Sequence, residues 1–148
     1  MLTTIRIATI AAVTCAALTA GTALADDHVY TEGPIVNMQA VRTEYGRFDD
    51  YMNYLNSTWK QEQQAGKKAG YILSYKVLQV EARGENDPDV YLVVTFKNWA
   101  ALDGATAKAD AIFKQVVGSV AASNQSAVER SKMRRVLGST TMQELELK

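Results

Sequence analysis

Four side chains have the chemistry to line a site for a small aromatic molecule: Asn37, Trp59, Tyr75 and Trp99. A pocket lined by aromatic groups, with a few polar groups to orient the ligand, is the usual form of a small-molecule site. We therefore predict that these four residues bind a ligand. Aromatic residues at strand and helix positions also build ordinary cores, so a packed interior without a ligand stays open as the alternative.

The stretch Asp26-Asp27-His28 is a second candidate, for a metal ion. If a leader peptide is removed after Ala25, the new N-terminus offers a free amine, two amide nitrogens and the imidazole of His28. Four nitrogens in one plane suit Cu(II) and Ni(II). The alternative is a histidine in a loose arm that binds no metal.

The first 25 residues predict such a leader. Arg6 supplies a positive charge, and the apolar run 7–20 is too short for a comfortable membrane span. The small-x-small pattern Ala23-Leu24-Ala25 then predicts signal-peptide cleavage after Ala25, hence a periplasmic or secreted protein. Cleavage would remove Cys15, the only cysteine, which excludes disulfides and thiol chemistry in the mature chain.

Charge and motifs exclude several function classes. The chain has 16 basic and 16 acidic residues, and losing Arg6 leaves 15 against 16, so we expect neither nucleic acid nor a membrane surface as a partner. The phosphate-binding patterns GxGxxG and GxxxxGK[ST] and the nucleophile pattern GxSxG do not occur. Asp49 and Asp50 are adjacent on a predicted helix and face different directions, so they favour helix-start electrostatics over paired catalysis.

The periodicity of apolar residues predicts an alternation of strands and helices after a flexible arm at 26–33. The expected strands are Ile35–Thr43, Tyr71–Ala82, Val90–Lys97 and Gly138–Leu147, with a start as early as Arg135 left open for the last one. The expected helices run from near Tyr45 to Ala65 and, with Asn98 as the cap, from Trp99 to about Val120. The segment Asn124–Lys132 is either a short further helix or a continuation of the second one. This order is the ferredoxin-like β-α-β-β-α-β arrangement of the α+β class. It predicts one domain over 34–148, with a four-stranded antiparallel sheet and both main helices on one face.

Both sides of the two central hairpin strands are apolar, which leaves the second face of the sheet without an obvious cover. Val90, Leu92 and Val94 alternate with Tyr91 and Val93. Soluble monomers rarely expose an apolar face of this size. We therefore predict a homodimer that packs sheet face to sheet face about a two-fold axis. The alternative is that the tail 139–148 or the N-terminal arm folds over that face.

The element order, the helix stripe through Leu55 and Trp59, and the junction FKNWAALD at 96–103 resemble the dimeric α+β barrel superfamily, which includes antibiotic-biosynthesis-type monooxygenases and stress-responsive barrel proteins. The resemblance implies a pocket between the sheet and its helices. In the monooxygenase branch, a histidine often follows the junction tryptophan. Trp99 matches the tryptophan, but Asp103, Lys108 and Asp110 stand on the following helix and no histidine does.

We expect an exported protein that binds a small apolar or aromatic molecule without a cofactor, in a pocket near the Trp99 end of the second helix. One alternative is a cofactor-free oxygenase or isomerase acting on a phenolic or quinone-like substrate. There Trp99 and Tyr75 would position the ring, and Asn37 would stabilise a developing oxyanion. A second alternative is a structural or partner-binding dimer without a ligand.

Overall fold

The computed structural model describes residues 28–148, which form one four-stranded sheet and a layer of helices. The strands are β1 (Tyr30–Thr43), β2 (Ile72–Gln79), β3 (Val90–Phe96) and β4 (Arg134–Leu147). They lie in the order β2-β3-β1-β4, and all neighbours are antiparallel. The predicted ferredoxin-like α+β fold is confirmed. The predicted signal peptide, with Asp26 and Asp27 of the predicted metal site, lies outside the described residues.

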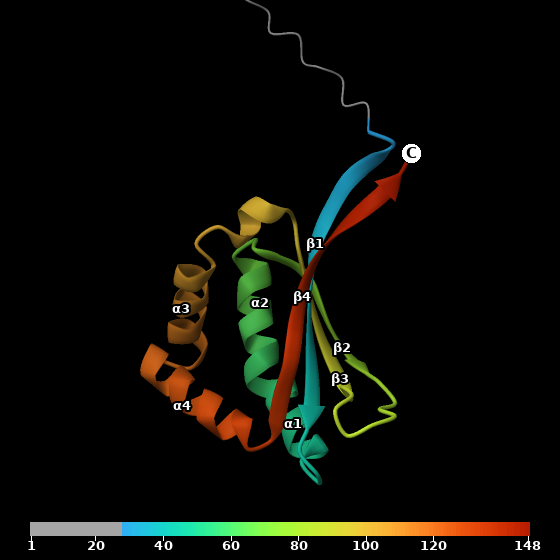
Figure 1. Cartoon of the computed structure of the whole chain (residues 1–148). Coiled ribbons are helices and arrows are strands. Elements are labelled where there is room, and N and C mark those ends of the chain that lie inside the picture. The colour runs from blue at the N-terminus through green and yellow to red at the C-terminus, as the bar shows by residue number, and fades with distance from the viewer. Residues whose placement is uncertain (1–27) are drawn as a thin grey trace, which may run out of the picture.

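Figure 1 shows that the helices gather on one side of the sheet. They are α1 (Phe48–Tyr54), the π-helical turn η1 (Leu55–Trp59), α2 (Lys60–Lys68), the 3₁₀ helix η2 (Trp99–Leu102), α3 (Ala105–Val116) and α4 (Val120–Ser131). In the part of the chain that the structure describes, no element lies on the second face of the sheet. The proposed cover by the tail does not form, because residues 139–147 belong to the edge strand β4.

The first helix runs without interruption from α1 through η1 into α2. It begins at Phe48 rather than at Tyr45, because Gly46 turns the chain with a φ of +70° and leaves Tyr45 in solvent. Within η1 the backbone N–H of Lys60 bonds to the carbonyl of Leu55, five residues earlier. This wide turn changes the register of the helix and places Trp59 against the sheet.

The second helical region differs from the prediction, which had one helix from Trp99 to about Val120 before the segment Asn124–Lys132. The Asn98 side chain accepts a hydrogen bond of 3.1 Å from the backbone N–H of Ala101, so the predicted cap is confirmed. The 3₁₀ helix then stops, and Gly104 with a φ of +65° starts α3 at a new angle. Gly118 with a φ of +95° ends α3, and Ser119 caps α4. Two glycines in left-handed conformations therefore divide the segment.

The strands β1 and β4 are longer than predicted. β1 begins at Tyr30 rather than at Ile35, and β4 begins at Arg134, one residue before Arg135, the earlier of its two predicted starts. Residues 30–32, which we had assigned to the flexible arm, pair with the C-terminal end of β4, where Tyr30 lies opposite Leu147. The two strands form a ribbon that continues past the rest of the sheet (Figure 1). This extension is possible because each strand supplies hydrogen-bond partners for the backbone N–H and C=O groups of the other.

The register decides which strand residues face the helices. Val90 and Leu92 of β3 lie opposite Val41 and Gln39 of β1 and point toward the helix layer. Together with Tyr51, Leu55 and Trp59 they form the buried core. The alternate residues of β3, among them Val93, point to the second face.

Candidate functional site

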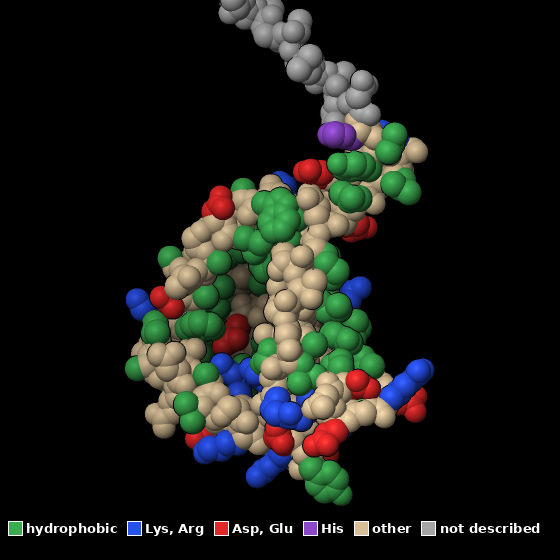
Figure 2. All heavy atoms as spheres, viewed as in Figure 1, with side chains coloured by type: hydrophobic (Ala, Val, Ile, Leu, Met, Phe, Trp, Pro, Cys, Tyr) green, Lys and Arg blue, Asp and Glu red, His purple; other side chains and the backbone are tan. Residues whose placement is uncertain are grey.

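A cavity of about 290 Å³ lies between α2, α3 and the ends of β2 and β3. It is lined by Trp59, Glu62, Gln63, Tyr71, Ile72, Phe96, Ala101, Leu102, Ala105, Lys108, Ala109, Ile112 and Phe113. Figure 2 shows a hollow on this side of the molecule, between the helices α3 and α4 and the strand β4, with an acidic side chain inside. The wall is mostly apolar and aromatic, as small-molecule sites are.

The cavity exists because the helices present small residues at this end of the layer. Ala101, Ala105 and Ala109 stand four residues apart and turn toward the cavity. On the facing helix, Gly66 lets α2 approach β2 closely, since a Cβ at this position would come within 2.6 Å of the Ile72 Cδ1 atom. The helices are therefore held near the sheet while the space between them stays unfilled.

Glu62 is the one acidic residue on the cavity wall. Its exposed fraction is 9 %, and among residues 28–148 its carboxylate makes no hydrogen bond and no ion pair within 4.0 Å. Burial raises the pKa of Glu62 above its ordinary range, and the positive charge of Arg130 opposes that shift. A buried carboxyl group without a partner is costly and uncommon.

Sequence reasoning missed Glu62, although the signal was present. The buried positions of the first helix are Tyr51, Leu55, Trp59, Glu62 and Gly66, at spacings of three or four residues. A carboxylate that continues an apolar stripe at helical spacing is a buried acid. The apolar stripe that we predicted ended at Trp59, so Glu62 and Gly66 were not recognised as its next buried positions.

Two positively charged side chains near the cavity already contact other groups of the protein. The Lys108 Nζ atom donates a 2.8 Å hydrogen bond to the carbonyl of Ala101 and lies 4.8 Å from the centre of the Tyr71 ring. The Arg130 guanidinium lies 5.1 Å from the centre of the Tyr54 ring. Burial, and then the charge of Glu62, raise the pKa of Tyr54 to about 12. The phenol of Tyr54 is therefore neutral at ordinary pH.

The structure brings together two of the four residues that we predicted as ligand-binding. Trp59 lines the cavity, and its ring meets the ring of Tyr75 edge to face, with 5.5 Å between centroids. Tyr75 itself lines a neighbouring shallow groove with Leu55 and Val77 rather than the cavity. Trp59 thus forms the wall between cavity and groove.

Asn37 and Trp99 lie elsewhere. The amide nitrogen of Asn37 donates to the hydroxyls of Ser139 and Thr141 on β4, at 3.1 Å and 2.9 Å, so both of its N–H groups have acceptors. Trp99 is 51 % exposed, and its indole N–H donates to the Gln143 side chain at 3.1 Å. Neither residue lines the cavity, although the Trp99 end of the helical region does border it through Ala101 and Leu102.

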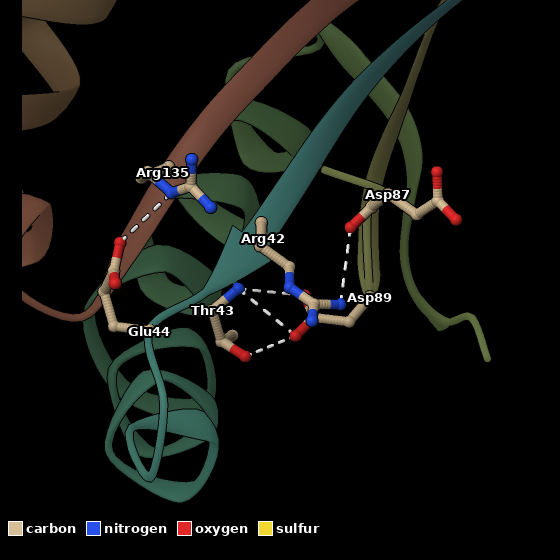
Figure 3. A network of polar contacts seen from close by, with 6 residues as sticks. All are labelled: Arg42, Thr43, Glu44, Asp87, Asp89 and Arg135. Carbon is tan, nitrogen blue, oxygen red and sulfur yellow. Dashed lines mark hydrogen bonds and ion pairs between the residues drawn. The ribbon is translucent and has the colours of Figure 1, made fainter. Parts of the chain in front are cut away.

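A second group of polar residues surrounds a larger depression of about 430 Å³ at the end of β1. Figure 3 shows how its members pair with one another. The Asp89 carboxylate accepts from the backbone N–H and the hydroxyl of Thr43. Arg42 donates to the carbonyl of Asp87, and Arg135 pairs with Glu44 at 3.4 Å. These contacts hold β1 to its neighbours. The polar residues around the depression therefore have a structural role that requires no ligand.

Among residues 28–148, no three His, Cys, Asp or Glu side chains are close enough to hold an ion. His28, the one described member of the predicted N-terminal metal site, stacks its ring on Tyr30 with 5.2 Å between centroids. No helix of the described range is long and apolar enough to cross a membrane.

Comparison with solved structures decides the fold. HapK from Hahella chejuensis superposes with a TM-score of 0.50 at 11 % identity, over 74 % of this chain and 91 % of that one. The chain has the ferredoxin-like α+β fold. A protein from Shewanella oneidensis gives a TM-score of 0.51 at 13 % identity, over 79 % and 96 % of the two chains. A protein from an uncultured marine organism, described as dimeric and ferredoxin-like, gives 0.50 at 14 %, over 78 % and 97 %.

No family model matches the sequence, and no curated protein matches it. At these identities the solved structures establish the fold and leave function to the chain's own residues.

Proposed function

We propose that the protein binds a small aromatic molecule in the cavity between α2, α3 and the sheet. The observation that carries this proposal is an apolar space of about 290 Å³ beside a well-packed core. An apolar cavity of about 150 Å³ accepts benzene, so this volume suits a one- or two-ring ligand. Trp59, Tyr71 and Phe96 supply aromatic surface for stacking.

Filling the cavity tests this function. Ala109 lines the cavity, whereas Ala111 on the same helix is exposed and does not. We expect naphthalene and 2-naphthol to bind the wild-type protein in calorimetric titrations. Ala109→Leu should lower the affinity at least tenfold, and the matched control Ala111→Leu should leave it unchanged. Equal affinities of both variants, or no binding by the wild type, would contradict the proposal.

We also propose that two copies pack through the open faces of their sheets. Val36 and Met38 of β1, Val93 of β3 and Met142 of β4 point to that face in the observed register. The exposed fraction of Met142 is 40 %, and that of Leu78 is 45 %. Burying such side chains contributes roughly 1.5–3 kcal/mol each. The marine neighbour is described as a dimeric, ferredoxin-like protein, which supports the pairing of two copies.

Light scattering tests the dimer. The wild-type protein should show twice the mass of one chain at micromolar concentration. Met38→Lys places a charge at the centre of the open face and should give monomers. The control Val128→Lys changes a residue of α4 that is 60 % exposed and should leave the dimer intact. Dissociation by both substitutions, or by neither, would argue against a sheet-to-sheet interface.

Export to the periplasm or the medium, with cleavage after Ala25, is the third part of the proposal, and the tripartite segment 1–25 supports it. The N-terminal sequence of the exported protein should begin at Asp26. Such a chain should then bind one Cu(II) ion through its terminal nitrogens and His28, visible by absorbance titration. His28→Ala should abolish that absorbance, and its persistence would place the metal elsewhere.

A further inference from the structure

Glu62 has the position of a ligand contact. Its carboxylate lies on the wall of the cavity, nine-tenths buried, and none of residues 28–148 donates a hydrogen bond to it. Apart from Lys108, the side chains of α3 that line the cavity, such as Ala105 and Phe113, are apolar. An apolar core residue in place of Glu62 would remove the cost of the buried carboxylate. The position therefore stabilises the protein less than it could.

The nearby charged groups have other contacts. Lys108 is committed to the Ala101 carbonyl and the Tyr71 ring. Arg130 stacks on Tyr54 and influences Glu62 through its charge alone, from beyond ion-pair distance. A donor for the Glu62 oxygens must then come from what fills the cavity.

We propose that the ligand of this cavity carries a hydroxyl or N–H group that donates a hydrogen bond to Glu62, as a phenol does and a quinone does not. This inference rests on the proposed function and specifies the ligand class of the same site. An ionised carboxylate only accepts hydrogen bonds, so it attracts a phenolic O–H and disfavours a carbonyl or ether oxygen placed against it. The aromatic ring would lie against Trp59 and Phe96.

A matched pair of ligands isolates this contact. 2-Naphthol donates a hydrogen bond, and 2-methoxynaphthalene presents the same ring system with an oxygen that only accepts. Calorimetric titration of the purified protein at pH 8 should show 2-naphthol binding at least about tenfold tighter, the effect expected of one hydrogen bond to a charged acceptor. In Glu62→Leu the ratio of the two affinities should fall to within about twofold, because the acceptor is gone.

A second variant covers the case in which Glu62→Leu does not fold. Glu62→Gln keeps the size of the side chain and adds N–H donors, so 2-methoxynaphthalene should gain affinity and the ratio should fall as well. Equal affinities in the wild type, or a ratio that neither substitution changes, would overturn the role of Glu62 and indicate a carboxylate satisfied by water. If neither ligand binds the wild type, the proposed function fails, and this inference fails with it. If both ligands bind equally and Ala109→Leu abolishes the binding, only the inference fails.

Discussion

The helix layer of this protein meets the sheet in two ways. At one end, Tyr51 and Leu55 press on Val41, Val90 and Leu92, and each of these side chains is exposed by 6 % or less. At the other end, the same continuous helix and α3 leave a cavity of about 290 Å³. The difference lies in residue size and polarity. The buried side chains at the packed end are all aromatic or branched, whereas at the hollow end three alanines and the carboxylate of Glu62 stand among such side chains. One end thus stabilises the fold, while the other leaves the space in which we propose that a ligand binds.

Truncation of the packed end should have the largest effect. Leu55→Ala should lower the free energy of unfolding by about 2–5 kcal/mol, because it opens a cavity among fully buried neighbours. Ile112→Ala, at the half-buried edge of the existing cavity, should cost less than half as much. Urea unfolding measures both. Equal losses would mean that the two ends are equally well packed.

A larger side chain should destabilise the packed end and should be tolerated at the hollow end. Val90 is fully buried, so Val90→Phe should cost about 1–3 kcal/mol through overpacking. Ala109→Leu adds volume where space exists and should leave the free energy of unfolding unchanged or raise it by up to about 1 kcal/mol. Melting temperatures of the two variants report the sign. A comparable loss for Ala109→Leu would show that the cavity is not available to a larger side chain.

The packed end was largely predictable from sequence, whereas the residues that line the hollow end, apart from Trp59, were not. The periodicity of Leu55 and Trp59, and the alternation around Val90, are local patterns that identify a core. The cavity depends on Gly104 and on the π-turn η1, which set the angle of α3 and the register of α2. Such angles arise from tertiary packing and leave little trace in the periodicity of one segment. The contacts of Asn37 with Ser139 and Thr141 depend on strand register for the same reason.

The Glu62 carboxylate at the hollow end should make the free energy of unfolding depend on pH. Burial raises the pKa of Glu62 in the folded protein, so the folded state holds its proton more tightly than the unfolded state. The free energy of unfolding should then fall as the pH rises from the ordinary carboxyl range through the raised pKa, and it should level off above that. Glu62→Gln should remove this decline and be the more stable form at pH 8.

Urea unfolding at several pH values between 4 and 8 gives the comparison between wild type and Glu62→Gln. Glu129, which is exposed and paired with Lys132, provides the control, since Glu129→Gln should leave the pH dependence as it is. A wild-type profile that rises over this interval, with no change in the Glu62 variant, would indicate that the buried carboxyl group has a partner in solution.

Trp99 borders the hollow end from outside, and its substitution should have the smallest effect. The indole is half exposed, and its one polar contact is the exposed hydrogen bond to Gln143. Trp99→Phe should therefore lower the free energy of unfolding by less than about 1 kcal/mol. It should also leave the affinity for 2-naphthol unchanged, because Trp99 does not line the cavity. Trp59→Phe, which alters the cavity wall, should change that affinity several-fold and serves as the matched comparison. If Trp99→Phe weakens binding as much as Trp59→Phe does, the Trp99 indole must close over the bound ligand, and the site would extend along η2 toward β4.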